Sequence, residues 1–289
     1  MVAKIRVFMT GMSRPDPMVV AIVALAIACL AVPLSACETV VHQQAGEITT
    51  DQWDVLNIQF RADELPVNPV DVKFSAIFTS EEDESLSVEG FYNGNNEYLI
   101  RFTPPSAGTW SYVTSSPLTP LDQQSGELTV QLAEGGRKGG IEINSENRLS
   151  FSYANGGSYF PIAFESDWLF ALDAAHAAGI PKTQKLVDTL AENGFNQIVM
   201  NVYAHDVDWP KDGELDPRFD YGSPKVFPFL GNNNAPDYRS LNIEYFKRLD
   251  RVIEYLDQKG IVAHLMIYVW NKQVAWPEAN SEADNRYFD

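Results

Sequence analysis

Aromatic rings stand beside hydrogen-bonding side chains at three places in the second half of the chain. Each place directly follows a short apolar run, and the residues concerned are Glu165, Trp168, His205, Asp206, Tyr268, Trp270 and Asn271. A sugar ring has an apolar C–H face that stacks on aromatic rings, and hydroxyl groups that need carboxylate, amide or imidazole partners. The composition of these three places therefore suits the binding of a carbohydrate.

Several of these residues have a second interpretation. His205 and Asp206 could share a metal ion or a proton, or contact separate hydroxyl groups, and we favour separate contacts because successive side chains of a strand point apart. Glu165 could instead be a buried acid paired with a lysine, and Trp168 could belong to the core. His264 lies in the middle of an apolar run, so we expect it to pack in the core.

The elements that must position these residues alternate between two periodicities. Apolar runs, typical of strands buried on both faces, cover residues 159–164, 198–203 and 261–268. Helical patterns over 185–193 and 241–256 separate them, and they stop at Gly194 and Gly260, residues suited to a C-terminal cap. This alternation of strand and helix predicts a parallel sheet.

Such a sheet is either a doubly wound open sheet or a (β/α)₈ barrel. No strand is followed by G-x-G-x-x-G or G-x-x-x-x-G-K, so nucleotide-binding doubly wound sheets lose support. A barrel needs about 250 residues, and residues 147–289 hold only the first strands of one. We therefore expect the N-terminal portion of an incomplete TIM barrel, in a chain that is a piece of a longer protein.

The first half of the chain has a different pattern. Between residues 50 and 134, short segments such as 53–60 and 70–78 alternate with a period of two and are separated by turn residues. Five or more such strands within about 80 residues suggest a β-sandwich. The large residues expected in its core are Trp53, Phe91 and Trp110.

The first 36 residues have the pattern of an export signal. Three basic residues precede an apolar run over 19–32 that is short for a membrane span. The following Leu34-Ser35-Ala36-Cys37 resembles the bacterial lipoprotein box, in which the cysteine is acylated and becomes the new N-terminus. We expect removal of residues 1–36, a lipid on Cys37, a tether over 37–49, and a place in the cell envelope, periplasmic or at the surface. The alternatives are an ordinary signal peptide or an uncleaved anchor.

The charge and the cysteine content argue against a nucleic-acid-binding, a disulfide-rich or a zinc-binding protein. The chain has 21 Lys and Arg against 39 Asp and Glu, a net charge of −18. Removal of residues 1–36 leaves 18 bases and 38 acids, a net charge of −20, which argues against binding of nucleic acid. Two cysteines make no disulfide framework, and no C-x-x-C or His–Cys cluster suggests zinc. We expect no metal and no cofactor.

Motifs in both halves resemble those of bacterial glycoside hydrolases. Residues 88–94 (VEGFYNG), 98–104 (YLIRFTP) and 108–112 (GTWSY) resemble the immunoglobulin-like domain that precedes certain glycoside hydrolase barrels. Residues 151–160 (FSYANGGSYF), 165–168 (ESDW), 194–196 (GFN) and 245–261 resemble the start of apiosidase-like glycoside hydrolase barrels. Phe164 departs from this pattern, because many relatives have glycine before the acidic residue of strand one.

The resemblance implies an immunoglobulin-like sandwich over 50–134, a glycine-rich linker over 135–146 and the first part of the barrel domain over 147–289. It also implies a retaining hydrolase, in which two carboxylates about 5–5.5 Å apart cleave the glycosidic bond. In the family these acids follow barrel strands four and seven. We therefore expect the catalytic acids beyond Asp289, the 289-residue piece to be inactive, and a polysaccharide or oligosaccharide as substrate.

Two other functions are weighed against this one. A non-catalytic glycan-binding or structural surface lipoprotein would keep the scaffold without the two acids. A dinucleotide- or phosphate-binding domain is disfavoured by the missing glycine loops.

The lipoprotein hypothesis predicts the effect of a single substitution. Cys37→Ser should abolish incorporation of labelled palmitate in bacterial cells, because the thiol that accepts the acyl group is gone. Replacement of Cys29, which lies inside the signal, provides the control and should leave labelling intact. Unchanged labelling of the Cys37→Ser protein would refute the assignment.

Overall fold

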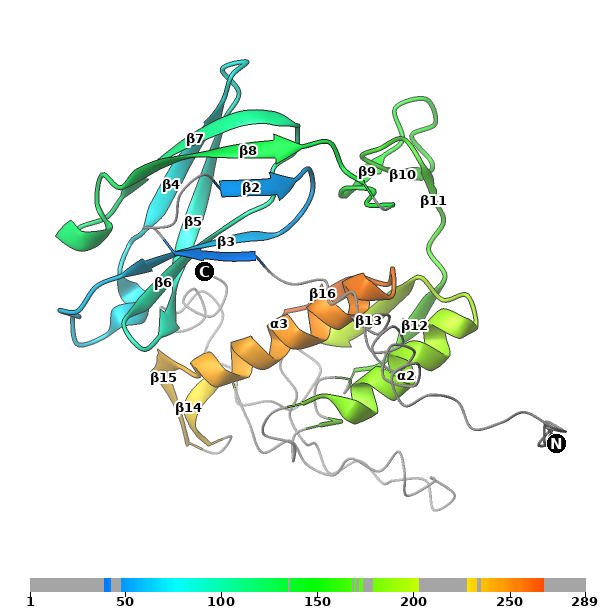
Figure 1. Ribbon diagram of the computed structural model, residues 1–289. Helices are drawn as coiled ribbons and strands as arrows, with labels where there is room; N and C mark the ends of the chain where they lie inside the picture. Colours follow the sequence, from blue (N-terminus) through cyan, green and yellow to red (C-terminus); the bar gives the residue numbers. More distant parts are fainter. Residues whose placement is uncertain are drawn as a thin grey trace, which may run out of the picture. The chain divides into compact units, whose positions relative to one another are not determined.

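The computed structural model describes residues 39–42, 48–134, 136–167, 169, 172–173, 179–202, 228–232 and 235–267. The chain divides into two units, residues 1–37 and 38–289, and all described residues belong to the second. Strands predominate in this unit, with one large sheet and the helices α2 and α3 (Figure 1). In this part of the chain, no helix is long and apolar enough to cross a membrane.

The large sheet has eight strands in the order β1-β3-β6-β5-β4-β7-β8-β2. The strands are β1 Thr39–His42, β2 Ile48–Asp51, β3 Leu56–Arg61, β4 Ser75–Ser80, β5 Ser85–Gly94, β6 Glu97–Phe102, β7 Gly108–Ser115 and β8 Ser125–Gln131, with 3₁₀ turns at Pro69–Asp71 and Thr119–Leu121. Strand β5 pairs with β4 through residues 85–89 and with β6 through residues 90–94. This long strand therefore joins the two halves of the sheet.

The two halves pack against each other through aromatic side chains. Phe102 of β6 stacks on Phe78 of β4, with ring centroids 3.8 Å apart, and meets Trp110 of β7 at 5.4 Å. Trp110 is fully buried, as predicted. Gly90 lies where an added Cβ would come within 2.4 Å of the Phe74 ring, so only glycine allows this close approach of β5.

Phe91 and Trp53 do not lie in this core. Phe91 is exposed, because β5 alternates and Gly90 takes the inward position; its ring instead lies 5.2 Å from the guanidinium of Arg101. Trp53 is half-buried in a turn, with a φ of 65°. The prediction of core packing is therefore wrong for Phe91 and only partly met by Trp53.

A small antiparallel sheet follows, in the order β11-β10-β9. Its strands are β9 Ile141–Ile143, β10 Phe151–Tyr153 and β11 Ser158–Tyr159. Strand β9 lies inside the stretch interpreted as a linker, and it pairs with β10 in the register Ile143 to Phe151.

The buried strand predicted over 159–164 is wrong. Tyr159 ends β11, the next strand β12 spans Ala163–Glu165, and Phe160 between them is 78% exposed. The side chain of Asn196 holds the intervening backbone, since its Oδ1 accepts from the amide of Ile162 at 2.7 Å and its Nδ2 donates to the carbonyl of Phe160 at 2.8 Å. The backbone hydrogen bonds thus go to a side chain rather than to a neighbouring strand.

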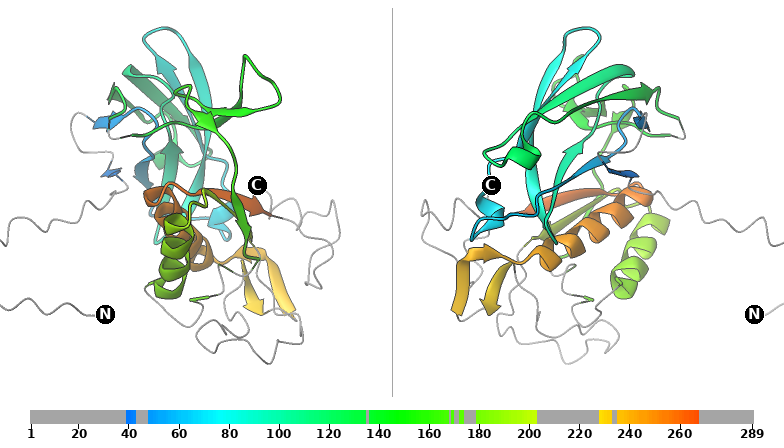
Figure 2. Two further views of the ribbon diagram at one scale, coloured as in Figure 1. Left: turned by 90° about the vertical axis from the view of Figure 1, so that its right-hand side faces the viewer. Right: turned by 60° about the vertical axis from the view of Figure 1, so that its left-hand side comes forward.

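A parallel three-stranded sheet, β12-β13-β16, forms the remainder with its helices. The elements are α2 Pro181–Glu192, β13 Gln197–Asn201, the hairpin β14 Phe229–Asn232 and β15 Ala235–Leu241, α3 Ile243–Gln258, and β16 Val262–Met266. The predicted alternation of parallel strands and helices is confirmed for these elements. Helices α2 and α3 lie side by side on the same face of the sheet (Figures 1 and 2).

Both helices end in the same Schellman motif. Gly194 and Gly260 have φ values of 80° and 68°. In each motif the amide after the glycine donates to the carbonyl of the third residue from the helix end, at 3.0 Å in α2 and 2.9 Å in α3. The next strand starts within three residues, so the predicted glycine caps are confirmed and lead each helix into a strand of the sheet.

A buried carboxylate caps the other end of α2. Asp173 accepts hydrogen bonds from the amides of Lys182 at 3.0 Å and Thr183 at 2.8 Å. Arg248 of α3 donates to the backbone carbonyl of Asp173. These bonds satisfy amides that the helix itself leaves unpaired, and they tie the start of α2 to α3.

Arg101 links the large sheet to α3. Its guanidinium donates two hydrogen bonds to Asp250, of 2.9 and 3.0 Å, and its Nε donates to Asn57 Oδ1 at 2.8 Å. Both charged side chains are about one-third exposed, at 31% and 33%. A bidentate pair of this kind is directional and partly shielded from water.

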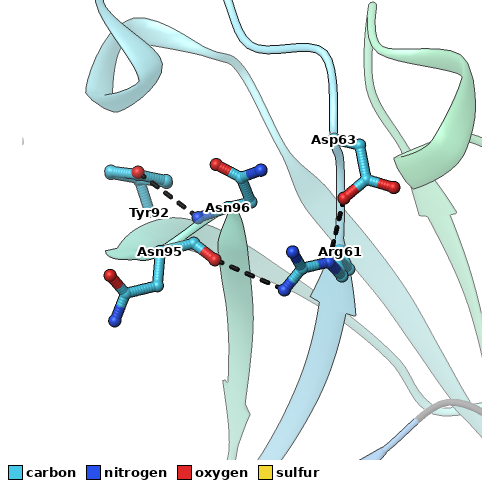
Figure 3. Close-up of polar contacts among 5 residues, drawn as sticks. All are labelled: Arg61, Asp63, Tyr92, Asn95 and Asn96. Carbon is cyan, nitrogen blue, oxygen red and sulfur yellow. Dashed lines mark hydrogen bonds and ion pairs between the residues drawn. The ribbon is translucent and has the colours of Figure 1, made fainter.

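Loss of this bidentate pair should destabilise the protein. We expect Arg101→Met to lower the free energy of unfolding in urea by about 1–2 kcal/mol, because Asp250 and Asn57 lose their partner in a half-buried place. The control is Arg61→Met: Arg61 pairs with Asp63 at 2.9 Å and donates to the carbonyl of Asn95 (Figure 3), but the ion pair is 60% and 80% exposed. The control should cost less than about 0.5 kcal/mol. Equal losses in the two variants would contradict the assignment.

A second prediction concerns acid stability. Asp188 of α2 accepts hydrogen bonds from Lys259 Nζ at 2.6 Å and from the Tyr255 hydroxyl at 2.8 Å, and these bonds lower the pKa of Asp188 below its ordinary 3.8. A carboxyl with a lowered folded-state pKa contributes stability that is present above the ordinary value and is lost as pH falls below it. The difference in melting temperature between wild type and Asp188→Asn should therefore be largest near neutral pH and shrink below about pH 4.

Tyr255→Phe, which removes one of the two hydrogen bonds, should show the same trend with a smaller amplitude. A wild-type advantage that stays constant between neutral and strongly acidic pH would contradict the interpretation.

Candidate functional site

The candidate site lies at the carboxyl edge of the parallel sheet. Strand β12 ends at Glu165, β13 at Asn201 and β16 at Met266. Glu165 pairs with Val199, and Asn201 pairs with Met266. Because the three strands are parallel, their carboxyl ends lie at one edge, which is where parallel α/β folds place ligands and active sites.

The helices cover one face of this sheet and decide which side chains reach the other. Ile198, Met200 and Val202 are buried in a cluster that includes residues of α2 and α3. Side chains alternate along a strand, so Gln197, Val199 and Asn201 point to the opposite face. Figure 2 shows both helices on the same side of the sheet. We call the opposite side the free face.

Glu165 belongs to the free face. Phe164, its neighbour in β12, packs edge-on against Phe195 with ring centroids 5.9 Å apart, and Phe195 borders the cluster under the helices. The alternation then turns Glu165 the other way. Glu165 is exposed, and no hydrogen bond or ion pair joins it to another residue that the structure describes. It is thus available to a ligand and is not a buried acid beside a lysine.

Asn201 is the second polar side chain at this edge, and it is not among the site residues predicted from the sequence. It is 2% exposed, and its Oδ1 has no hydrogen-bond partner among the described residues. A buried polar atom without a partner costs about 1–3 kcal/mol. The feature of the sequence that points to Asn201 is its position as a single amide inside the apolar run over 198–203. The composition of that run predicts a strand and does not by itself indicate a binding residue.

The polar side chains nearer the amino end satisfy one another. The Tyr159 hydroxyl donates to Gln197 Oε1 at 3.0 Å, and Gln197 Nε2 lies 3.1 Å from His264 Nδ1. Burial, with a smaller contribution from Tyr153, raises the pKa of Tyr159, so its hydroxyl keeps its proton. Because Gln197 Oε1 accepts from Tyr159, its amide nitrogen is the donor to Nδ1, and His264 carries its proton on Nε2.

His264 is exposed on the free face, so the prediction that it packs in the core is wrong. Ala263 and Leu265 border the cluster under the helices, and the alternation turns His264 away from them. Its register partner is Val199, which also pairs with Glu165. The imidazole thus lies level with Glu165, two strands away.

The other predicted site residues lie outside the described residues; they are Trp168, His205, Asp206, Tyr268, Trp270 and Asn271, and the predicted lipidation residue Cys37 also lies outside. Of the predicted set, the structure therefore places Glu165. Among the residues it describes, no group of three or more His, Cys, Asp or Glu side chains is placed to hold a metal ion.

Two segments match known families. Residues 145–288 match a family described as "Apiosidase-like, catalytic domain". Residues 49–117 match a domain of unknown function, DUF5060. The first match covers the parallel sheet and the candidate site, and the second covers most of the eight-stranded sheet. A search of curated proteins found no match.

The chain is also similar to solved structures. A provisionally assigned glycoside hydrolase from Bacteroides vulgatus ATCC 8482 is 27% identical, with a TM-score of 0.63 over 76% of this chain and 41% of that protein. A family 5 mannosidase from Rhizomucor miehei is 18% identical over 46% of this chain and 28% of its own, with a TM-score of 0.31. This chain thus spans less than half the length of the Bacteroides protein.

Proposed function

Since the chain is glycoside hydrolase-like, we propose that it is part of an exported glycoside hydrolase that cleaves a polysaccharide or oligosaccharide with retention of configuration. One observation carries the proposal: the parallel sheet within the apiosidase-like segment has a carboxylate, Glu165, and a buried amide, Asn201, at its carboxyl edge on the face that the helices leave free. An acceptor carboxylate and an amide at the same edge of the sheet suit the hydroxyl groups of a sugar.

The proposed architecture is an immunoglobulin-like sandwich over 50–134 and the first part of a (β/α)₈ barrel over 147–289. The aromatic contacts between the two halves of the large sheet support the sandwich. Strands β12 and β16 are the outer strands of the parallel sheet, and each pairs only with β13 in the described part of the chain. A barrel pairs every strand on both sides, so these two edges suit further strands.

In the proposed reaction, the two carboxylates that retaining enzymes place about 5–5.5 Å apart lie beyond Asp289. The predicted site residues within the 289-residue chain bind the sugar. Glu165 accepts protons from hydroxyl groups, Trp168 and Trp270 offer rings for stacking, and the other binding groups are His205, Asp206, Tyr268 and Asn271. Their chemistry suits the two kinds of surface that a sugar ring presents.

The location we propose is the cell envelope, with a lipid on Cys37. The basic leader, the apolar run and Leu34-Ser35-Ala36-Cys37 support it. The large sheet would then act as a brace between the tether and the catalytic domain, because Arg101 binds α3 through two hydrogen bonds to Asp250.

The test is expression of the complete reading frame, without the leader, beside residues 38–289 alone. We expect the complete protein to release reducing sugars from at least one member of a polysaccharide panel, and the first product seen by proton NMR to keep the anomeric configuration of the substrate. The shorter piece should show no turnover, because the proposal places both catalytic carboxylates outside it.

Glu165→Gln in the complete protein should lower kcat/KM by about 10-fold or more, because an amide replaces a charge-assisted acceptor. Turnover by the shorter piece, or inversion of configuration, would contradict the proposal. Binding of a polysaccharide without turnover by the complete protein would favour a glycan-binding lipoprotein instead.

A further inference from the structure

We propose that Asn201 is a substrate-binding residue whose Oδ1 accepts a hydrogen bond from a hydroxyl group of the sugar; this inference rests on the proposed function and assigns part of the same site. Its basis is the contrast between the two ends of β13. The strand carries one amide at its first residue, Gln197, and one at its last, Asn201, both on the free face.

Both ends of the amide at the amino end are hydrogen-bonded within the protein. Gln197 Oε1 accepts from the Tyr159 hydroxyl at 3.0 Å, and Gln197 Nε2 donates to His264 at 3.1 Å. Its polar groups are thus accounted for by the fold. We infer that Gln197 has a structural role at the end of the sheet that usually serves stability in barrels.

The amide at the carboxyl end is not used in this way. Asn201 is 2% exposed, and its Oδ1 lacks a hydrogen-bond partner in the described part of the chain. The cost of such an atom exceeds what a typical hydrogen bond contributes, so an apolar side chain of similar size would serve the fold better. An asparagine there is explained by a ligand group that pairs with it.

The chemistry of the amide limits the ligand. One end of the side chain accepts hydrogen bonds and the other donates two, whereas an ionised carboxylate such as Glu165 only accepts. The unpartnered atom of Asn201 is at the accepting end, so the ligand group that pairs with it must donate, as the hydroxyl group of a sugar does. A sugar that is substituted at this hydroxyl group would leave the buried oxygen unpaired and should bind more weakly.

The experiment compares Asn201→Leu with Gln197→Leu in the protein from the complete reading frame without its leader. The melting temperature is measured alone and with saturating xylotetraose, cellotetraose or mannotetraose. A ligand that binds only the folded state raises the melting temperature. We expect Asn201→Leu without sugar to melt at or above the wild-type temperature, and its affinity for the sugar that stabilises wild type to fall about 10-fold or more.

Gln197→Leu should lower the stability of the protein without affecting the binding of sugar. It leaves the buried hydroxyl of Tyr159 without its acceptor, so the melting temperature without sugar should fall, while the shift caused by sugar should remain. Should Asn201→Leu not fold because leucine does not fit, Asn201→Ala decides the question, since it removes the same polar atoms without adding volume.

The outcomes separate the inference from the proposed function. A wild-type shift with sugar that Asn201 variants keep in full, or a clear drop in melting temperature in Asn201→Leu and Asn201→Ala together with full sugar affinity, would overturn the role of Asn201 and leave the hydrolase proposal standing. If no tetrasaccharide shifts wild type and the complete protein hydrolyses no polysaccharide, the proposed function fails and takes this inference with it.

Discussion

The packing of α2 and α3 against one face of β13 is the constraint on which the candidate site depends. Ile198, Met200 and Val202 enter the apolar cluster under the helices, and the strand period of two then commits the residues between them to the free face. A shift of one residue in the strand would exchange the two sets. The side chain of Asn196, which holds the backbone before β12, and the Schellman motif before β13 fix that alignment from both sides.

Directional hydrogen bonds hold the same two helices in place. Asp173 binds two amides at the start of α2 and is itself held by Arg248 of α3. On its other side, α3 presents Asp250 to Arg101 of the large sheet. Helix α3 thus contacts the apolar cluster, the residue that caps α2, and the eight-stranded sheet.

Local patterns predicted most of these elements, and long-range pairing accounts for the failures. The strands around 53–60, 98–102 and 110–113 and the glycine caps follow from periodicity and turn chemistry, which act over a few residues. The run over 159–164 has the composition of a buried strand, but Asn196, more than 30 residues away, takes its hydrogen bonds. His264 was predicted to lie in the core, and Asn201 was not selected, because an apolar run does not reveal which face of a strand the helices will cover.

The distribution of polar groups on the free face also bears on whether the parallel sheet belongs to an open doubly wound sheet or to the barrel that we propose. A doubly wound sheet has helices on both faces, so its strands are apolar throughout. Here the free face carries the polar side chains of Glu165, Gln197, Asn201 and His264. If helices also packed on this face, they would bury these polar groups, which costs free energy. Gln197 at the amino end pairs with Tyr159 and His264, whereas Asn201 Oδ1 at the carboxyl end has no partner among the described residues. That asymmetry supports the barrel that we propose, because a barrel uses one end for stability and the other for a ligand.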